Sequence, residues 1–157
     1  MTNVVRTKHV WKLALPLMIA WATFLGGPTS ARATTALAVN GTLSTHIVSC
    51  STLCTSGTIS GTLSGTFDYT MSTMTATSNG NIFFLEGTFV IVTSTGTLTA
   101  TDKTVWNVST GQFNDIAFIT GGTGAYAGAT GVMDIVGTFD IAAGTGQSQY
   151  AGAVVLP

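Results

Sequence analysis

TISGTLSGTFDYTMS, residues 58–72, alternates strictly between polar positions and positions held by glycine or an apolar residue. Successive side chains of a β-strand point to opposite faces, so a period of two predicts one apolar face and one polar face. The residues expected to face inward are Ile59, Gly61, Leu63, Gly65, Phe67, Tyr69 and Met71. The surrounding segment 57–76 is therefore either one long bent strand or two strands of an all-β fold.

Similar segments recur along the rest of the chain. They are rich in threonine, valine, isoleucine and phenylalanine, which favour strands, and short turn sequences separate them. Strands are predicted over residues 36–48, 57–76, 81–93, 97–108, 113–121, 130–142 and 147–156. Short connections join antiparallel neighbours, so seven or eight such strands predict a small closed barrel or a sandwich.

A repeat of Gly-Thr followed by Leu, Ile or Phe runs through these strands. It begins at Gly41, Gly57, Gly61, Gly65, Gly87, Gly96 and Gly137. The glycine and the large residue of each repeat share a face, and alternating small and large side chains fill the inside of a tightly curved barrel. The same alternation predicts that Met133, Ile135, Phe139 and Ile141 point inward and that Asp134 and Asp140 point outward.

Residues 1–33 have the layout of a cleaved secretory signal peptide. A basic leading segment is followed by the uncharged apolar segment 13–25 and by Ala31-Arg32-Ala33, a small-x-small cleavage pattern. The apolar segment is shorter than the about 20 residues that span a bilayer; an uncleaved N-terminal anchor is the alternative. We therefore expect residues 34–157 to form one exported domain, secreted or periplasmic, with no membrane association after cleavage.

Removal of the signal changes the charge of the protein. The whole chain has five basic and six acidic residues, but only Lys103 among the basic ones lies beyond residue 33, so residues 34–157 carry a formal charge of −5. One lysine cannot neutralise a series of phosphates, which argues against nucleic acid as a partner. Anionic membrane surfaces are disfavoured for the same reason.

The chain has two cysteines, Cys50 and Cys54. An oxidising compartment favours a disulfide between them, provided that the chain turns enough to bring their Cα atoms within about 7 Å. A zinc site lacks ligands, because only His46 accompanies the two thiols in residues 34–157. We expect a disulfide and no metal.

Asp102 is the acid that the pattern connects most directly with chemistry. Spacing places Asp102 on the same strand face as Leu98, Ala100 and Trp106. If that face lines a barrel, burial raises the pKa of Asp102 and suits it to general acid or base catalysis. Alternatively, a bulge turns Asp102 and Lys103 to solvent as a surface pair, and adjacent charges favour this second reading because they commonly mark a strand end or turn.

Three further polar residues lie on predicted strands. The orientation of Asp115 stays undecided, because neither face of its strand is clearly polar. Tyr69 is expected to face inward, where its hydroxyl needs a partner and can orient a ligand; a plain core tyrosine is the alternative. His46 is expected to face water, which disfavours a Ser-His-Asp triad.

The strand at 81–93 is apolar on both faces. Its inward residues are expected to be Phe83, Leu85, Gly87, Phe89 and Ile91. The outward face then carries a stripe made of Ile82, Phe84, Val90 and Val92. An exposed apolar stripe suggests a covered surface, so we expect a homo-oligomer, a trimer or a dimer, that is formed through this stripe.

Residues 119–131, ITGGTGAYAGATG, are the most distinctive string in the chain. They do not match a nucleotide-binding loop, because no lysine follows the glycines and the next segment is a predicted strand rather than a helix. The string instead indicates a wide glycine turn in which Tyr126 is the one large side chain.

This string resembles the signature turn of the allene oxide cyclase and dirigent superfamily, which many secreted bacterial proteins share. Residues 137–140, GTFD, and the closing strand near Tyr150 are similar to the C-terminal end of that group, so the resemblance covers about residues 110–156. It implies an eight-stranded antiparallel barrel, often trimeric. Enzymes of the superfamily cyclise or isomerise hydrophobic small molecules inside the barrel, or steer a coupling there, without a cofactor.

The sequence therefore predicts an exported, cofactor-free cyclase or isomerase that acts on a hydrophobic small molecule in the barrel cavity. The candidate catalytic residues, Asp102 and Tyr69, rest on their own pattern, because the resemblance does not cover the strands that carry the catalytic residues of the family. The candidate substrate-binding residues are Phe67, Met71, Phe89, Trp106 and Tyr126. Two alternatives remain: a barrel that binds a hydrophobic ligand without changing it, and a packed structural or surface protein. Cavity volume separates the last from the other two.

Overall fold

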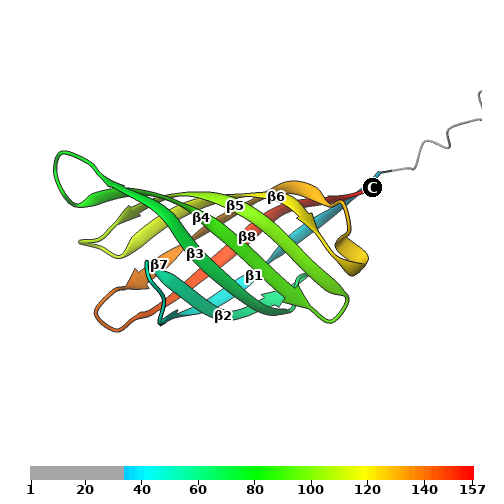
Figure 1. The fold of residues 1–157 in the computed structure, drawn as a ribbon, viewed down its shortest axis with the longest axis horizontal. Coiled ribbons are helices and arrows are strands. Elements are labelled where there is room, and N and C mark those ends of the chain that lie inside the picture. Colours follow the sequence, from blue (N-terminus) through cyan, green and yellow to red (C-terminus); the bar gives the residue numbers. More distant parts are fainter. Residues whose placement is uncertain (1–33) are drawn as a thin grey trace, which may run out of the picture. The chain divides into compact units, whose positions relative to one another are not determined.

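The computed structural model describes residues 34–157, and the predicted signal peptide lies outside the described residues. Eight antiparallel strands form a closed barrel in which each strand pairs with its neighbours in chain order and the last pairs with the first (Figure 1). The strands are β1 (Thr35–Val48), β2 (Cys54–Gly61), β3 (Gly65–Ala76), β4 (Ile82–Thr93), β5 (Gly96–Asn107), β6 (Gln112–Gly122), β7 (Thr130–Asp140) and β8 (Thr145–Leu156). The prediction of an all-β barrel is confirmed.

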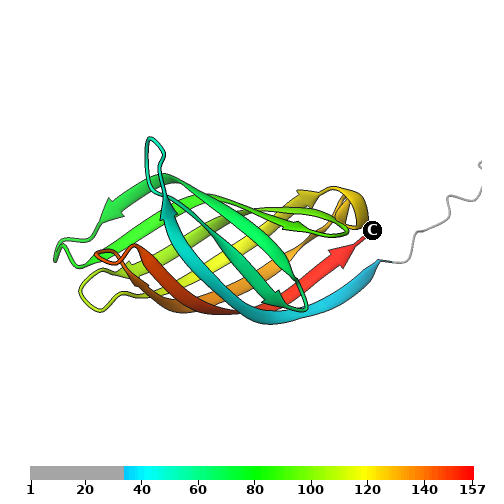
Figure 2. The ribbon, with the colours of Figure 1, turned by 90° about the horizontal axis from the view of Figure 1, so that it is seen from below.

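The barrel has two ends of different construction (Figures 1 and 2). At one end, called the loop end here, lie the connections 49–53, 77–81, 108–111 and 141–144. At the other, called the plug end, lie the tight turns 62–64 and 94–95 and the connection 123–129, which contains the 3₁₀ turn η1 (Gly124–Tyr126). Among the described residues, no helix is long and apolar enough to cross a membrane.

The segment 57–76 forms two strands, β2 and β3, rather than one bent strand. Gly61 adopts a φ of 118°, which side chains rarely allow, and the chain turns there. The backbone carbonyl of Asn40 accepts hydrogen bonds from the backbone N–H and the hydroxyl of Thr62, both at 2.9 Å, and so fixes the turn. Leu63 points inward as predicted and is almost fully buried, whereas Gly61 is exposed at the end of β2, where the chain turns.

A solid hydrophobic core fills the plug end. Its fully or nearly fully buried side chains include Val39, Leu63, Ile91, Leu98, Ala129 and Val154. The side chain of Tyr150 on β8 passes over Gly41 of β1 to the β2–β3 turn. There its hydroxyl accepts a hydrogen bond from the N–H of Leu63 at 2.9 Å and donates one to the Leu63 carbonyl at 3.2 Å. Both backbone groups of a buried turn residue are thereby satisfied, which stabilises this end of the barrel.

The inward glycines of the repeat make room for aromatic rings on the neighbouring strand. Gly41 lies opposite Tyr150 and Gly57 lies opposite Phe67. A Cβ atom at Gly41 would lie 2.7 Å from the ring of Tyr150, and one at Gly57 would lie 2.9 Å from that of Phe67. The predicted alternation of small and large residues along each strand is therefore present. In these two pairs, a large residue also lies opposite the glycine on the neighbouring strand.

Strand β7 ends earlier than predicted. Ile141 was expected to face inward, but β7 stops at Asp140 and Ile141 is exposed. The carboxylate of Asp140 accepts hydrogen bonds from the backbone N–H groups of Ala142 and Ala143, at 2.9 and 3.0 Å, and so starts the turn into β8. A side chain that binds its own downstream backbone favours a turn over a continued strand.

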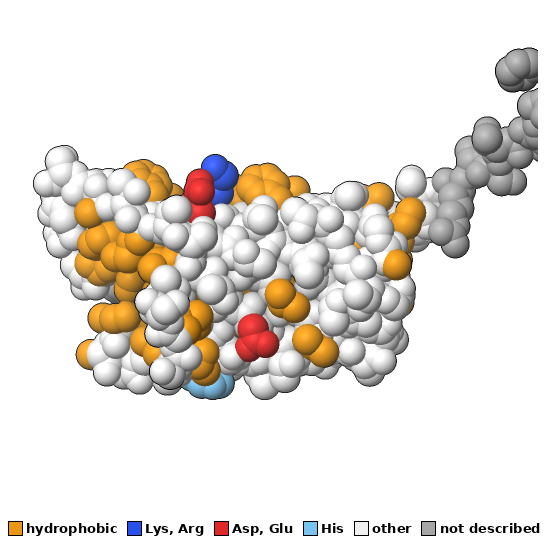
Figure 3. Space-filling view, viewed as in Figure 1, with side chains coloured by type: hydrophobic (Ala, Val, Ile, Leu, Met, Phe, Trp, Pro, Cys, Tyr) orange, Lys and Arg blue, Asp and Glu red, His pale blue; other side chains and the backbone are white. Residues whose placement is uncertain are grey.

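The outer surface is mostly uncharged. Uncharged polar groups and backbone dominate the face in Figure 3, where hydrophobic side chains gather toward the loop end. The predicted stripe faces outward: Phe84 and Val92 are exposed, and Ile82 and Val90 are partly buried. Phe84 pairs with the exposed Val105 of β5, so the apolar surface extends beyond the stripe.

Candidate functional site

The half of the barrel nearer the loop end holds a cavity of about 100 Å³. Its apolar walls come from strands all around the barrel and include Leu43, Phe67, Leu85, Phe89, Phe113, Ile135 and Phe139. Phe67 and Phe89 stack with ring centres 5.0 Å apart, and Trp106 meets Phe139 edge to face at 6.2 Å. Packed aromatic pairs hold their rings in defined positions, so the cavity has shaped, mainly apolar walls.

Two aspartates from neighbouring strands interrupt this apolar lining. Asp102 on β5 is 3% exposed and Asp115 on β6 is 7% exposed. Asp115 lies opposite Thr104, and Thr104 is two residues beyond Asp102 on the same face of β5. The Thr104 hydroxyl donates a hydrogen bond of 2.9 Å to Oδ2 of Asp102. Oδ1 of Asp102 and Oδ1 of Asp115 are buried and have no hydrogen-bond partner within residues 34–157.

Burial raises the pKa of both carboxyl groups. The pKa of Asp115 is raised to about 8, first by burial and then by the negative charge of Asp102. Burial also raises the pKa of Asp102, although the hydrogen bond from Thr104 opposes the shift. Two adjacent carboxyl groups in a low-dielectric site do not both ionise readily. The pair therefore holds at least one proton at neutral pH, which either carboxyl can give up or take back.

Tyr69 on β3 reaches the same place because β4 has a glycine beneath its ring. A Cβ atom at Gly87 would lie 2.4 Å from the Tyr69 ring, and Gly87 pairs with Asp102 on β5. Burial, followed by the charges of Asp102 and Asp115, raises the pKa of Tyr69. The phenol therefore stays protonated and able to donate a hydrogen bond. Its buried hydroxyl faces Asp102, but it has no hydrogen-bond partner within bonding distance among the described residues.

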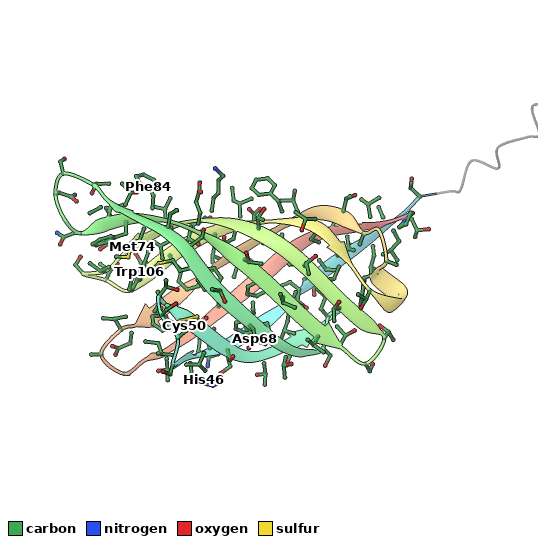
Figure 4. All side chains as sticks on the ribbon, in the orientation of Figure 1. His46, Cys50, Asp68, Met74, Phe84 and Trp106 are labelled. Carbon is green, nitrogen blue, oxygen red and sulfur yellow. A yellow bond between two sulfur atoms is a disulfide. The ribbon has the colours of Figure 1, made fainter. Side chains whose placement is uncertain are left out.

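Trp106 adds a second donor to the lining. Its side chain lies in the loop-end half of the barrel (Figure 4) and is 6% exposed. The indole N–H is buried with no acceptor among residues 34–157. Because buried donors nearly always find acceptors in proteins, this group is available to an oxygen atom of a molecule in the cavity.

A disulfide loop borders the cavity at the loop end. Cys50 and Cys54 lie at disulfide distance, with Cα atoms 6.0 Å apart, which confirms the predicted pairing. The loop contributes Leu53 to the cavity lining. Two hydrogen bonds join the loop to the backbone of Met71 on β3. The Thr52 hydroxyl donates to the Met71 carbonyl at 3.1 Å, and the Met71 N–H donates to the Leu53 carbonyl at 3.0 Å. Such a disulfide is consistent with a non-cytoplasmic protein.

The structure brings most of the predicted site residues together. Tyr69, Phe67, Phe89, Trp106 and Asp102 all line the cavity. Strand β5 runs without a bulge past Asp102, so Asp102 points inward while Lys103 points outward and binds Glu86 at 2.9 Å. The alternative of a solvent-exposed Asp102–Lys103 pair is therefore wrong.

Two predicted binding residues lie away from the cavity. Met71 is partly buried and does not line the cavity, and its backbone binds the disulfide loop. Tyr126 is buried at the plug end, because the glycine turn closes into η1 and inserts the ring into the solid core. His46 is exposed on the outer face, as expected (Figure 4).

Sequence reasoning missed several residues of the site. Asp115, Thr104, Phe113, Phe139 and Ser148 line the cavity without having been singled out as site residues. A signal for Asp115 existed: the short connection between the strands predicted at 97–108 and 113–121 sets the β5–β6 register and brings Asp115 opposite Thr104. Within residues 34–157, no three His, Cys, Asp or Glu side chains are grouped so that they could hold a metal ion.

Comparisons with models of protein families, with curated proteins and with solved structures find no match for this chain.

Proposed function

We propose that the protein is an exported, cofactor-free isomerase or cyclase that acts on a hydrophobic small molecule inside the barrel. The observation that carries this proposal is the buried Asp102–Asp115 pair, with Tyr69 beside it, in the wall of an otherwise apolar cavity. Unpaired buried carboxyl groups cost stability, and strongly shifted pKa values gather at functional sites. A barrel built only for stability would be expected to carry apolar residues at these positions.

The carboxyl pair is suited to moving a proton between two positions of one molecule. The ionised carboxylate takes a proton from a carbon atom of the substrate, and the other carboxyl delivers its proton to a second position. The pair ends with the proton count with which it began, and no electrons are gained or lost. The Tyr69 hydroxyl donates a hydrogen bond to a substrate oxygen on which negative charge develops.

The shape of the cavity contributes the other part of the proposed catalysis. Rigid aromatic walls restrict the conformations of a flexible substrate, so that the atoms that must react are held near one another. A cyclisation benefits most from such restriction, because ring closure costs conformational entropy in solution. The stacked pair Phe67–Phe89 and the edge-to-face pair Trp106–Phe139 would supply these walls.

Membership of the allene oxide cyclase and dirigent superfamily is part of this proposal. The string at 119–131 and a closed barrel of eight antiparallel strands support it. Secretion or a periplasmic location is also proposed, supported by the layout of residues 1–33 and by the Cys50–Cys54 pair. The expected homo-oligomer, formed through the stripe of Ile82, Phe84, Val90 and Val92, completes it.

The cavity and its acidic residues bear on the two alternatives to an enzyme, a packed structural protein and a non-catalytic binding protein. A barrel packed solid as a structural protein would have no such volume, so the cavity weighs against that alternative. A binding protein that leaves its ligand unchanged needs the apolar walls but does not need two interior acids. The presence of Asp102 and Asp115 beside open volume therefore favours the enzyme over the binder.

Mass spectrometry of the small molecules that co-purify with the protein tests this proposal. The extracted molecule is returned to fresh protein, and its conversion to an isomer of equal mass is followed by chromatography. Asp102→Asn, Asp115→Asn and Tyr69→Phe should each slow conversion at least about a hundredfold. Asp134→Asn, on the outer face of the adjacent strand β7, is the matched control and should convert normally. Unchanged conversion in all three site variants would refute the assignment.

A further inference from the structure

Among the described residues, the cavity wall carries acidic side chains and no basic one. Asp102 and Asp115 are buried in its wall, and no positive group faces them from the described residues. Lys103, the lone lysine or arginine beyond residue 33, points outward and binds Glu86. His46 also lies on the outer face and is exposed. A buried carboxylate without a counter-ion is strongly disfavoured. A positively charged ligand would supply the counter-ion that the protein lacks here.

The unpartnered atoms specify the kind of cation. Oδ1 of Asp102, Oδ1 of Asp115 and the hydroxyl oxygen of Tyr69 are all buried without hydrogen-bond partners in residues 34–157. They come from three strands, and each can accept a hydrogen bond. A primary ammonium group has three N–H donors and no acceptor, so it satisfies all three oxygens at once. The Trp106 N–H remains available for an oxygen elsewhere on the ligand.

The remaining walls fit the apolar body of such a ligand. Aromatic faces attract a cation as well as an apolar group, and Phe113, Phe139 and Trp106 lie around the cavity. The cavity volume of about 100 Å³ is somewhat smaller than the roughly 150 Å³ of an apolar cavity that takes up benzene. A short chain beside the ammonium therefore fills the site, and a ring, as in benzylamine, would extend toward the loop end.

We infer that the cavity selects a small hydrophobic primary amine, which binds as the ammonium ion to Asp102, Asp115 and Tyr69. One carboxyl group ionises to pair with the ammonium, and the other keeps its proton. The inference rests on the proposed ligand cavity and names its substrate class.

Three probes of equal size test the inference: benzylamine, benzyl alcohol and benzoate. Binding to the full chain is measured by isothermal titration calorimetry at pH 7.5. In a chain with Trp11→Phe and Trp21→Phe, Trp106 is the one remaining indole, so its fluorescence reports binding inside the barrel. Benzylamine should bind at least about tenfold more tightly than benzyl alcohol, and benzoate should bind most weakly.

Variants test whether the Asp102–Asp115 pair causes the preference for benzylamine over benzyl alcohol. Asp115→Asn and Asp102→Asn should reduce the ratio of benzylamine to benzyl alcohol affinity to below about threefold, with benzyl alcohol binding unchanged. Asp134→Asn removes one negative charge from the outer face instead and should preserve the preference. If Asp134→Asn lowers the ratio as much as Asp115→Asn does, general charge attraction explains the preference and the inference is wrong.

The wild-type protein gives a second measurement that does not depend on the folding of any variant. Benzylamine is positively charged at both pH 5 and pH 8, whereas Asp102 and Asp115, the titratable groups that face Tyr69, hold more protons at pH 5. Its affinity should therefore fall on acidification, while that of benzyl alcohol stays constant. Equal binding of alcohol and amine, with a Trp106 response, would overturn the amine inference and leave the proposed function standing. No binding of any probe would count against both.

Discussion

The substitution Asp115→Asn should change how the stability of the barrel depends on pH. The pKa of Asp115 is raised from 3.8 to about 8 in the folded protein. Between these values the folded chain keeps a proton that the unfolded chain releases, so the free energy of unfolding falls as pH rises. One proton corresponds to about 1.4 kcal/mol per pH unit, which gives a loss of about 4 kcal/mol between pH 5 and pH 8.

Urea denaturation at pH 5, 6, 7 and 8, followed by circular dichroism, measures this slope. In Asp115→Asn the slope should decrease by about one proton, and the variant should be more stable than wild type at pH 8. Asp102 leaves a residual slope, because burial raises its pKa too; the double variant Asp102→Asn/Asp115→Asn should remove it. The charge of Asp134 contributes least to the raised pKa of Asp115, so Asp134→Asn should keep most of the wild-type slope. A wild-type stability that is constant or rises between pH 5 and pH 8 would refute the reasoning.

Four further substitutions test other parts of the structure. Tyr150→Phe removes both hydrogen bonds to the backbone of Leu63 and should lower the free energy of unfolding by about 1–3 kcal/mol, measured in urea. Gly87→Ala places a Cβ atom 2.4 Å from the Tyr69 ring, so it should lower the melting temperature and weaken benzylamine binding; an unchanged melting temperature would contradict the packing. Cys50→Ser/Cys54→Ser opens a loop with a sequence separation of 4 and should cost about 2 kcal/mol in oxidising buffer, with no further loss on adding reductant. Phe84→Thr should convert the expected oligomer to a monomer in light scattering after gel filtration, whereas a wild-type monomer would exclude the subunit contact.

The fold follows from features that are local in the sequence. The period-two alternation at 58–72 and the glycine turns predict strands and antiparallel neighbours, and these agree with β2 to β8 within a few residues. The repeat also indicates which face is interior. The exception at Ile141 arises because the Asp140 side chain competes for the backbone, a preference that alternation alone does not encode.

The site was harder to predict because it depends on register and on barrel closure. Asp102 and Asp115 are thirteen positions apart, and only the pairing of β5 with β6 makes them neighbours. Adjacent charges at Asp102 and Lys103 favour a turn in local terms. The ladder with β4 is nevertheless unbroken, and the ladder with β6 is regular from Ala100 to Trp106, so the strand continues past both charges. Tyr126 is the opposite case. Its position in a glycine turn favoured a place in the binding site, but its side chain packs into the solid core at the plug end.

Solvent deuterium tests the central claim, that the Asp102–Asp115 pair moves a proton within a bound molecule. The co-purifying molecule is incubated with the protein in D₂O and extracted, and its mass is measured by mass spectrometry. Wild type should introduce one deuterium at a carbon atom of the molecule, and Asp134→Asn should do the same. Asp102→Asn/Asp115→Asn should introduce none. Equal deuterium uptake with the double variant, or none with wild type, would contradict the account.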